Sequence, residues 1–255
     1  MNKKISAWYS FVSGDEYPQD DFFFFDVSDK DWVELLEKNH QKILEEINNL
    51  IYNKDKNIVP YYNKTLASES EKWTVFPLYI WGMKKFKNCT KCPQTVKLVE
   101  SVTGMTSASF SILKANSNIK PHLGDTNVMY RCHLGLQIPA QLPHCGIKAG
   151  NENRDWENGK ILSFCDAQRH TVWNDTNHDR LVLIIDVLRP EFIHEKNWIC
   201  AKILGTFFWQ FFFQNYYIIR HFPIWLRKMI MQVTQFFTMI FLKTNNFLGN
   251  FFSKK

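Results

Sequence analysis

His122 and His170 are two residues of this 255-residue chain that could bind a metal ion together. His122 lies between Pro121 and Gly124, just before a predicted strand, and His170 opens a second predicted strand 48 residues later. Imidazole nitrogens are common ligands of first-row transition metals. Two histidines at strand edges, one from each half of a small β-barrel, could meet at its mouth.

Arginines near these histidines could bind an acidic small molecule. Arg131 and His133 are two positions apart, so on a strand both side chains point to the same face. Arg180 leads into the apolar run that ends the β-rich region. Its planar fork suits a carboxylate held by two parallel hydrogen bonds. A structural ion pair with Asp186 or Asp166 is the alternative for Arg180.

These residues, taken together in order and spacing, resemble the catalytic domain of the aspartyl/asparaginyl β-hydroxylases between about Trp73 and Phe192. The motifs are Pro121-His122-x-Gly124-x-Thr126-Asn127, Arg131-x-His133-Leu134-Gly135-Leu136-x-Ile138-Pro139, Trp156-x-x-Gly159-Lys160, His170-x-Val172-Trp173, Arg180, Asp186-Val187 and Arg189-Pro190. The resemblance implies a mainly β, double-stranded β-helix (jelly-roll or cupin-like) fold that uses Fe(II) and 2-oxoglutarate.

The same resemblance implies roles for individual residues. His122 and His170 would be the iron ligands and therefore catalytic. Ser111, Arg131, His133 and Arg180 would bind 2-oxoglutarate, with Arg180 and Ser111 at its distal carboxylate and His133 and Arg131 nearer the iron.

Gly124 stands where most oxygenases of this class carry the third iron ligand, a carboxylate. Asp125 is a poor substitute, since on an extended strand it points away from His122. The family that this sequence resembles lacks the carboxylate, so the glycine agrees with the resemblance. It leaves a coordination position for water, and a chloride ion there would instead suit a halogenase.

The activity implied is a 2-oxoglutarate- and O2-dependent dioxygenase reaction that hydroxylates an unactivated C–H bond. By family analogy the target is the β-carbon of Asp or Asn in a peptide or protein. An acyl chain of a membrane lipid is the alternative substrate. A non-catalytic β-helix module that binds a metal or ligand is a hypothesis from a different class, and the retained 2-oxoglutarate set argues against it.

The elements that would position these residues can be read from hydrophobic periodicity. Residues 26–52 are predicted as a helix that braces a sheet, with Ser28 as a cap, and a short helix is predicted near 94–101. The predicted strands are 108–113, 128–138, 160–164, 170–173 and 180–188. Short strands between turn residues are typical of a sandwich or jelly-roll. The run 181–185 is apolar on both faces, which predicts an interior strand.

Composition and charge divide the chain in two. The charged fraction of 22% with 45% hydrophobic residues is typical of a globular protein. Residues 201–255 hold seven Lys and Arg and no Asp or Glu, which leaves 24 Lys and Arg against 25 Asp and Glu before them. The positive charge therefore lies in a tail and does not form a nucleic-acid-binding face.

The tail predicts association with a membrane. It contains aromatic runs at 207–213 and 236–242, and residues 203–219 carry no charge. Basic and aromatic residues around apolar stretches are typical of helices that lie at a lipid interface. We therefore predict an oxygenase domain with bracing helices over 1–198 and a membrane-associating tail over 199–255. A helix pair that covers the core or forms a dimer is the alternative.

The six cysteines do not form a disulfide pattern. They are scattered except for Cys89-x-x-Cys92. Half of a zinc site is one interpretation of this pair, but no second closely spaced pair of Cys or His follows it. We expect a plain pair of loop thiols.

Overall fold

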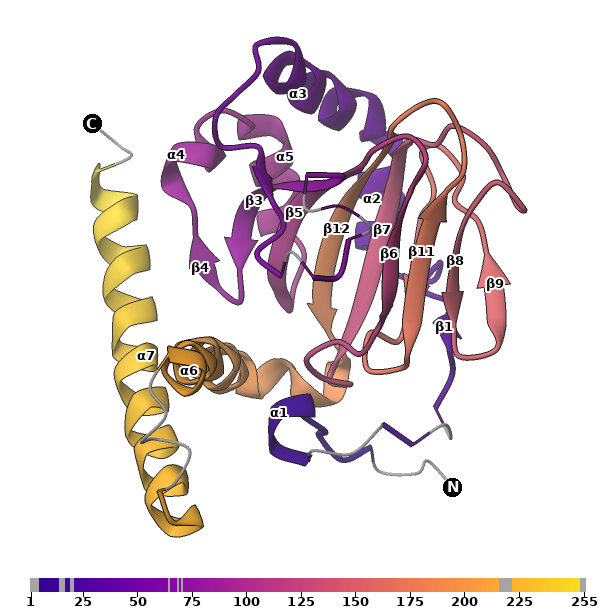
Figure 1. The fold of residues 1–255 in the computed structure, drawn as a ribbon. Coiled ribbons are helices and arrows are strands. Elements are labelled where there is room, and N and C mark those ends of the chain that lie inside the picture. The colour runs from indigo at the N-terminus through magenta and orange to yellow at the C-terminus, as the bar shows by residue number, and fades with distance from the viewer. Residues whose placement is uncertain are drawn as a thin grey trace.

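Two antiparallel sheets form the body of the protein (Figure 1). The computed structural model describes residues 5–13, 17–18, 21–63, 65–67, 69, 71–215 and 222–252. The larger sheet has the order β1 (Phe24–Phe25), β10 (Ile161–Phe164), β7 (Met129–Gln137), β12 (Arg180–Leu188), β5 (Met105–Leu113), β3 (Trp73–Ile80) and β2 (Val59–Pro60), with β4 (Met83–Lys84) paired to β3. The smaller sheet has the order β6 (Ser117–His122), β11 (His170–Asn174), β8 (Cys145–Ala149) and β9 (Glu152–Arg154).

The order in which the chain visits the sheets defines the fold. From β5 to β12 it passes between the sheets after almost every strand, so that β5, β7, β10 and β12 belong to the larger sheet and β6, β8, β9 and β11 to the smaller. Two four-stranded layers wound in this way make a double-stranded β-helix, and the predicted fold class is confirmed.

All five predicted strands are present within a few residues of their expected bounds. β12 lies between β5 and β7, as the run of apolar residues on both of its faces required. Strands β6, β8 and β9 were not predicted. Exposed positions alternate with buried ones in β6 and fill β9, which weakens the apolar signal, whereas β8 is mostly buried but short and contains Gly146 and Lys148.

The interior between the sheets is apolar and contains aromatic residues from both layers. Trp73, Trp156, Phe164, Val172 and Val182 belong to one buried cluster. A second cluster joins the outer face of the larger sheet to the helices, with Phe76, Phe110 and Leu183 against Ile43 and Ile47. The larger sheet is therefore covered on both faces.

The bracing region consists of two helices, α2 (Asp31–Lys38) and α3 (His40–Tyr52), where a single helix over 26–52 was predicted. The chain breaks at Asn39, whose side chain donates to the Leu35 carbonyl and ends the first helix. Ser28 does not cap the helix, because its amide and hydroxyl both bond Asp26 in a turn before it. The prediction was correct for the helical region and wrong for its first turn and its continuity.

A buried carboxylate fixes the bracing helices to the next pair, α4 (Phe86–Cys89) and α5 (Pro93–Glu100). Glu46 of α3 accepts hydrogen bonds from the backbone amides of Gln94 at 2.8 Å and Thr95 at 2.9 Å. A carboxylate at a helix N-terminus satisfies amides that have no partner within the helix. The predicted helix near 94–101 is confirmed, and Cys89 and Cys92 are buried free thiols beside it.

The C-terminal part forms a short 3-10 helix, η1 (Pro190–Glu195), then α6 (Lys196–Asn215) and α7 (Ile224–Phe252). Figure 1 shows α7 lying across α6 at one side of the domain. The first turns of α6 belong to the core, since Ile199 and Ile203 pack with Trp81, Met129 and Leu188. No helix within the described ranges is both long and apolar enough to cross a bilayer.

The predicted boundary between the oxygenase domain and the tail, after residue 198, falls inside α6. A substitution in the first turns of α6 tests whether they belong to the core. Replacing Ile203 by alanine should lower the free energy of unfolding by roughly 2–5 kcal/mol, because the loss of a fully buried isoleucine side chain leaves a cavity. Val233→Ala on the exposed side of α7 is the control and should change it by less than about 0.5 kcal/mol. Urea unfolding followed by tryptophan fluorescence measures both. Equal stability of the two variants would mean that α6 is a separate tail.

Candidate active site

The two predicted metal-binding histidines lie side by side. His122 ends β6 and His170 begins β11, and the two residues are direct partners in the antiparallel register of these strands. Their ring centroids are 4.1 Å apart. The pairing of two strand ends therefore brings together residues that are far apart in the chain.

Each ring is held by its Nδ1 atom. His122 Nδ1 lies 2.8 Å from the Lys120 carbonyl oxygen, and His170 Nδ1 lies 2.9 Å from the Gln168 carbonyl oxygen. A carbonyl oxygen only accepts, so each Nδ1 carries the proton and donates. This arrangement leaves both Nε2 atoms with a free lone pair, which is the form that binds a metal ion.

The environment also favours neutral rings. Burial lowers the pKa of His122, with nearby Asp166 opposing the shift. Burial and the neighbouring His122 ring lower the pKa of His170 well below its usual value. Both imidazoles are therefore unprotonated at neutral pH and able to coordinate.

Asp166 occupies the space next to Gly124. A Cβ atom built on Gly124 would lie 1.7 Å from Asp166 Oδ2 and 2.0 Å from its Cγ. The Gly124 amide also donates to the Asp166 carbonyl at 2.8 Å. A carboxylate is thus present beside the histidines, but it comes from the β10–β11 connection and not from position 124. Asp166 Oδ1 lies 3.6 Å from His170 Nε2.

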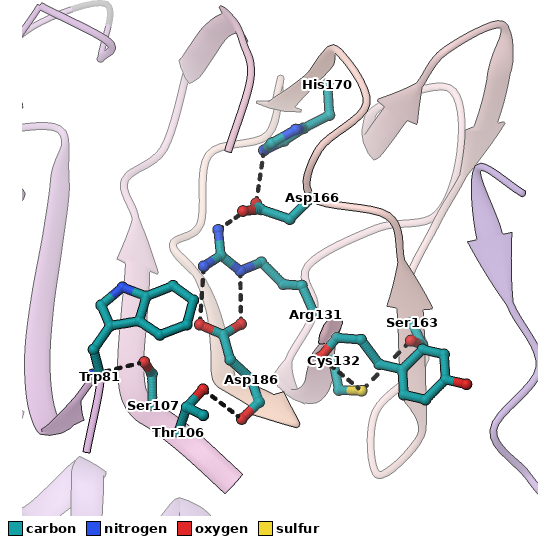
Figure 2. Close-up of polar contacts among 10 residues, drawn as sticks. Trp81, Thr106, Ser107, Arg131, Cys132, Ser163, Asp166, His170 and Asp186 are labelled. Carbon is teal, nitrogen blue, oxygen red and sulfur yellow. Dashed lines mark hydrogen bonds and ion pairs between the residues drawn. The ribbon is translucent and has the colours of Figure 1, made fainter. Parts of the chain in front are cut away.

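Arg131 links this carboxylate to the larger sheet (Figure 2). Its Nε and Nη2 donate to the two oxygens of Asp186 at 2.8 Å and 2.9 Å, and its Nη1 donates to Asp166. Arg131 and His133 both lie on β7, two positions apart, as predicted. The Arg131 guanidinium, however, is already bound to two acids. One guanidinium and two carboxylates give a net negative charge beside the histidine pair, which favours a bound cation.

Asp125, three residues after His122, adds a further acid near this group. Burial and the charge of Asp166 raise the pKa of Asp125 to about 7, while the charge of Arg131 opposes the shift. Its charge therefore changes near neutral pH.

Arg180 is in the opposite situation, because it is buried without an acid. Its side chain is 1% exposed, its Nη2 donates to Ser111 Oγ at 3.3 Å, and its Nε and Nη1 have no hydrogen-bond partner. Asp166 and Asp186 both bind Arg131, so the alternative of an ion pair between Arg180 and either acid is excluded. Burial lowers the pKa of Arg180 to about 10.

Ser111 lies between two donors. Trp73 Nε1 donates to its Oγ at 3.0 Å, and Arg180 Nη2 donates to the same oxygen. Since this oxygen already accepts twice, the hydroxyl proton of Ser111 is available for another acceptor. Ser111 and Arg180 together therefore present donors to an anion.

His133 and Trp156 extend this group of unpaired polar atoms. Both ring nitrogens of His133 and the Nε1 of Trp156 are buried without a hydrogen-bond partner. The two rings are nearly parallel with centroids 6.0 Å apart, and the Arg180 guanidinium lies 5.0 Å from the Trp156 ring centroid. Buried polar groups are normally hydrogen-bonded, so a cluster of unpaired donors is the signature of a polar ligand site.

The structure therefore brings the predicted residues into two adjoining groups. His122 and His170 form the possible metal site, and Ser111, Arg180 and His133 form the possible anion site. Phe164 connects them, with its ring centroid 5.0 Å from His133 and 5.2 Å from His170. Within the part of the chain that the structure describes, no group of three or more His, Cys, Asp or Glu is arranged to hold a metal ion. A direct contact of Arg131 with a ligand stays a prediction.

Sequence reasoning gave Asp166 and Trp156 no role in the site. Asp166 appeared only as a possible ion-pair partner of Arg180, and Trp156 only as part of a motif. The spacing of Asp166 four residues before His170 was visible, but its proximity to Gly124 depends on two loops that meet in space.

Comparison with known proteins decides the family. A family model described as aspartyl/asparaginyl beta-hydroxylase matches residues 37–190, more than half of the chain and the whole of the site described above. The chain belongs to the aspartyl/asparaginyl β-hydroxylase family.

Relatives within the hydroxylase family differ in what their names say they act on. The chain is 30% identical over 172 residues to an ornithine lipid ester-linked acyl 2-hydroxylase of Rhizobium tropici, covering 65% of this chain and 60% of that protein. It is 35% identical over 164 residues to the aspartyl/asparaginyl beta-hydroxylase of Mus musculus, covering 62% of this chain and 22% of that protein. The aligned segment is thus less than two thirds of either relative.

Solved structures with a similar arrangement of strands include two oxygenases. A Pseudomonas putida prolyl-4-hydroxylase has 14% identity and a TM-score of 0.40, covering 62% of this chain and 98% of that one. An oxidoreductase of the 2OG-Fe(II) oxygenase family from Burkholderia pseudomallei has 13% identity and a TM-score of 0.41, covering 57% and 77%.

Two hydroxylase-family motif residues next to the site anchor the N-terminal segment. Thr126 Oγ1 donates to the Trp8 carbonyl at 2.6 Å, and Asn127 Oδ1 accepts from the Trp8 amide at 2.8 Å. The N-terminal segment therefore holds the loop that follows His122 through these two hydrogen bonds.

Gly124→Ala tests whether Asp166 fills the space beside the histidines. The added methyl group would force the Asp166 carboxylate away from Arg131, so the free energy of unfolding should fall by roughly 1–3 kcal/mol. The double variant Gly124→Ala/Asp166→Ala removes the clash, leaves Arg131 its pair with Asp186, and should recover part of this loss. Gly205→Ala is the matched control, because its methyl group would meet its nearest neighbours, Thr234 and Thr238, at 3.6 Å. A Gly124→Ala variant as stable as the wild type would contradict the placement of Asp166.

Proposed function

We propose that this chain is an Fe(II)- and 2-oxoglutarate-dependent dioxygenase that hydroxylates an unactivated C–H bond. The observation that carries the proposal is the pair of His122 and His170 with free Nε2 atoms, next to a buried Arg180 that has no acid to bind. The first suits a divalent metal ion and the second suits the distal carboxylate of 2-oxoglutarate. Family membership supports the same assignment.

The residues divide the work as follows. His122 and His170 would hold the iron through Nε2, while the Lys120 and Gln168 carbonyls keep the two rings in that tautomer. Asp166, whose Oδ1 lies 3.6 Å from His170 Nε2, would stand beside the bound ion. Arg131 would orient Asp166, and its contact with the cosubstrate near the iron is the remaining part of this proposal.

The anion group would orient the cosubstrate. Arg180 and the Ser111 hydroxyl would bind its distal carboxylate, and His133 would contact the end nearer the iron. Trp156 and Phe164, which are both buried, would line this site with apolar surface and keep water away from it. When bound, iron and 2-oxoglutarate supply the oxidising chemistry that converts C–H to C–OH with O2.

The proposed substrate is the β-carbon of an Asp or Asn residue in a peptide or protein. The name of the mouse relative supports this choice. An acyl chain of a membrane lipid is the second candidate, and two observations favour it. The Rhizobium relative is named as a lipid acyl hydroxylase, and residues 201–255 carry aromatic runs with seven basic and no acidic residues. The proposal includes association with a membrane through this tail.

The metal assignment is tested by His122→Ala and His170→Ala. Each should lose stoichiometric Fe(II) binding and reduce succinate formation from 2-oxoglutarate by more than roughly a hundredfold, since even loss of an outer-sphere partner of a metal ligand costs about 10–100-fold. His144→Ala, which changes an exposed histidine, is the control and should keep both properties. Circular dichroism checks that the domain is folded. A wild-type protein that binds iron but never consumes 2-oxoglutarate would favour the non-catalytic module.

The anion assignment is tested by Arg180→Lys. A point charge replaces a planar fork, so the KM for 2-oxoglutarate should rise on the order of tenfold or more, with a smaller loss of kcat at saturation. Arg154→Lys changes an exposed arginine and should leave the KM unchanged. If Arg180→Lys also had an unchanged KM, the buried guanidinium would not bind the cosubstrate.

A further inference from the structure

Helix α7 buries polar side chains beside apolar ones and exposes a row of large apolar side chains. Its buried side includes Gln235 and Thr238, which are 7% and 5% exposed. Its opposite side is apolar and open to the outside, with exposed fractions of 53% for Phe236 and 63% for Phe237. In a water-soluble domain the apolar stripe faces the core and the polar side faces water.

The exposed residues form one continuous stripe. They recur at intervals of three and four residues and are Trp225, Met229, Val233, Phe236, Phe237 and Ile240, with Phe241 and Phe247 continuing it. This spacing keeps successive side chains on one side of an α-helix. The helix is 29 residues and roughly 43 Å long, and exposed apolar side chains recur along it from Trp225 to Phe247.

Specific contacts fix the orientation of α7. Gln235 Nε2 donates to the Trp198 carbonyl at 3.3 Å, and Asn246 Nδ2 donates to the Gly82 carbonyl at 2.9 Å. Gly205 of α6 faces Thr234 and Thr238 of α7. A rotation that buried the apolar stripe would break these hydrogen bonds, so the outward direction of the stripe is built into the fold.

Charge indicates what covers the stripe. The segment from 201 to the end has seven basic and no acidic residues, and exposed Lys243 lies one turn from Ile240 and Phe247. A second copy of this chain would bring an equally basic surface, and like charges would oppose the pairing. An anionic lipid surface supplies both an apolar interior and complementary charge.

We propose that the outer face of α7 docks on an anionic lipid bilayer, with the helix axis along the surface and the aromatic stripe in the interface. This assignment rests on the membrane association proposed above and names the surface responsible. The same helix pair reaches the loop beside the candidate active site, since the Phe207 and Tyr62 rings are 5.9 Å apart. Tyr61 in turn stacks on Trp73, the donor to Ser111.

Vesicle flotation of the full chain tests the docking face. The wild type should float with vesicles of equal parts phosphatidylcholine and phosphatidylglycerol, and more weakly with phosphatidylcholine alone. The triple variant Phe236→Ser/Phe237→Ser/Ile240→Ser should lower the partition coefficient by roughly a hundredfold or more, because three large apolar side chains leave the interface. Ile51→Ser/Tyr52→Ser, which removes exposed apolar side chains from α3, is the matched control and should float like the wild type.

Three outcomes would overturn the inference. The triple variant could float as well as the wild type, the control could lose as much binding as the triple variant, or the wild type could ignore vesicles and form a dimer that the triple variant disrupts. The last result would identify a second copy as the partner. Succinate formation without vesicles is measured on the same samples. Its retention by the triple variant separates failure of docking from failure of the proposed activity.

Discussion

The guanidinium of Arg131 joins the two halves of the candidate active site. It binds Asp186 of β12 through two hydrogen bonds and Asp166 of the β10–β11 connection through a third contact. Asp166 in turn occupies the space beside Gly124 and lies next to His170. A buried charge that loses its partner is strongly destabilising, so all three side chains hold one another in place. The histidine pair depends on this arrangement, because Asp166 closes one side of it.

The adjoining group around Arg180 shows the opposite situation, a buried charge without an acidic partner. Arg180 is fully buried, and two of its nitrogens have no acceptor. An unpaired buried donor costs about 1–3 kcal/mol, so the domain has less stability than the same core with these donors satisfied. A bound dicarboxylate would satisfy Arg180 and the Ser111 hydroxyl together. Ligand binding and domain stability are therefore linked through these donors.

Two sets of helices pack against the sheets, and they differ in the side chains that they bury. α3 covers the larger sheet with Ile43 and Ile47, and its Glu46 carboxylate caps α5. α6 fills a second cluster with Ile199 and Ile203, but α7 packs on it through a buried face that includes polar side chains and leaves its aromatic side open. The domain core thus extends through the first turns of α6 to Leu242 of α7. The outer surface of α7 carries the exposed aromatic side chains of Phe236 and Phe237.

The sequence by itself determined the elements and the chemistry that they carry. Alternating or continuous apolar runs located five strands, including the central β12, since side-chain burial in a strand repeats every two residues or covers both faces. The family motifs located His122, His170, Ser111, His133 and Arg180, which lie together in the structure. Polar or short strands such as β6 and β9 gave no comparable signal. The break between helices α2 and α3 at Asn39 depended on one side chain.

Only the tertiary structure decided which charged groups meet. Arg131 and Arg180 both lie on predicted strands. The sequence alone does not say which of them pairs with Asp166 and Asp186. Both acids bind Arg131, because β12 pairs with β7 in a register that places Asp186 beside Arg131 and the loop after β10 returns to the same point. Arg180, at the other end of β12, has no acidic partner. The side of α7 that faces outward was decided in the same way, by hydrogen bonds between residues far apart in the chain.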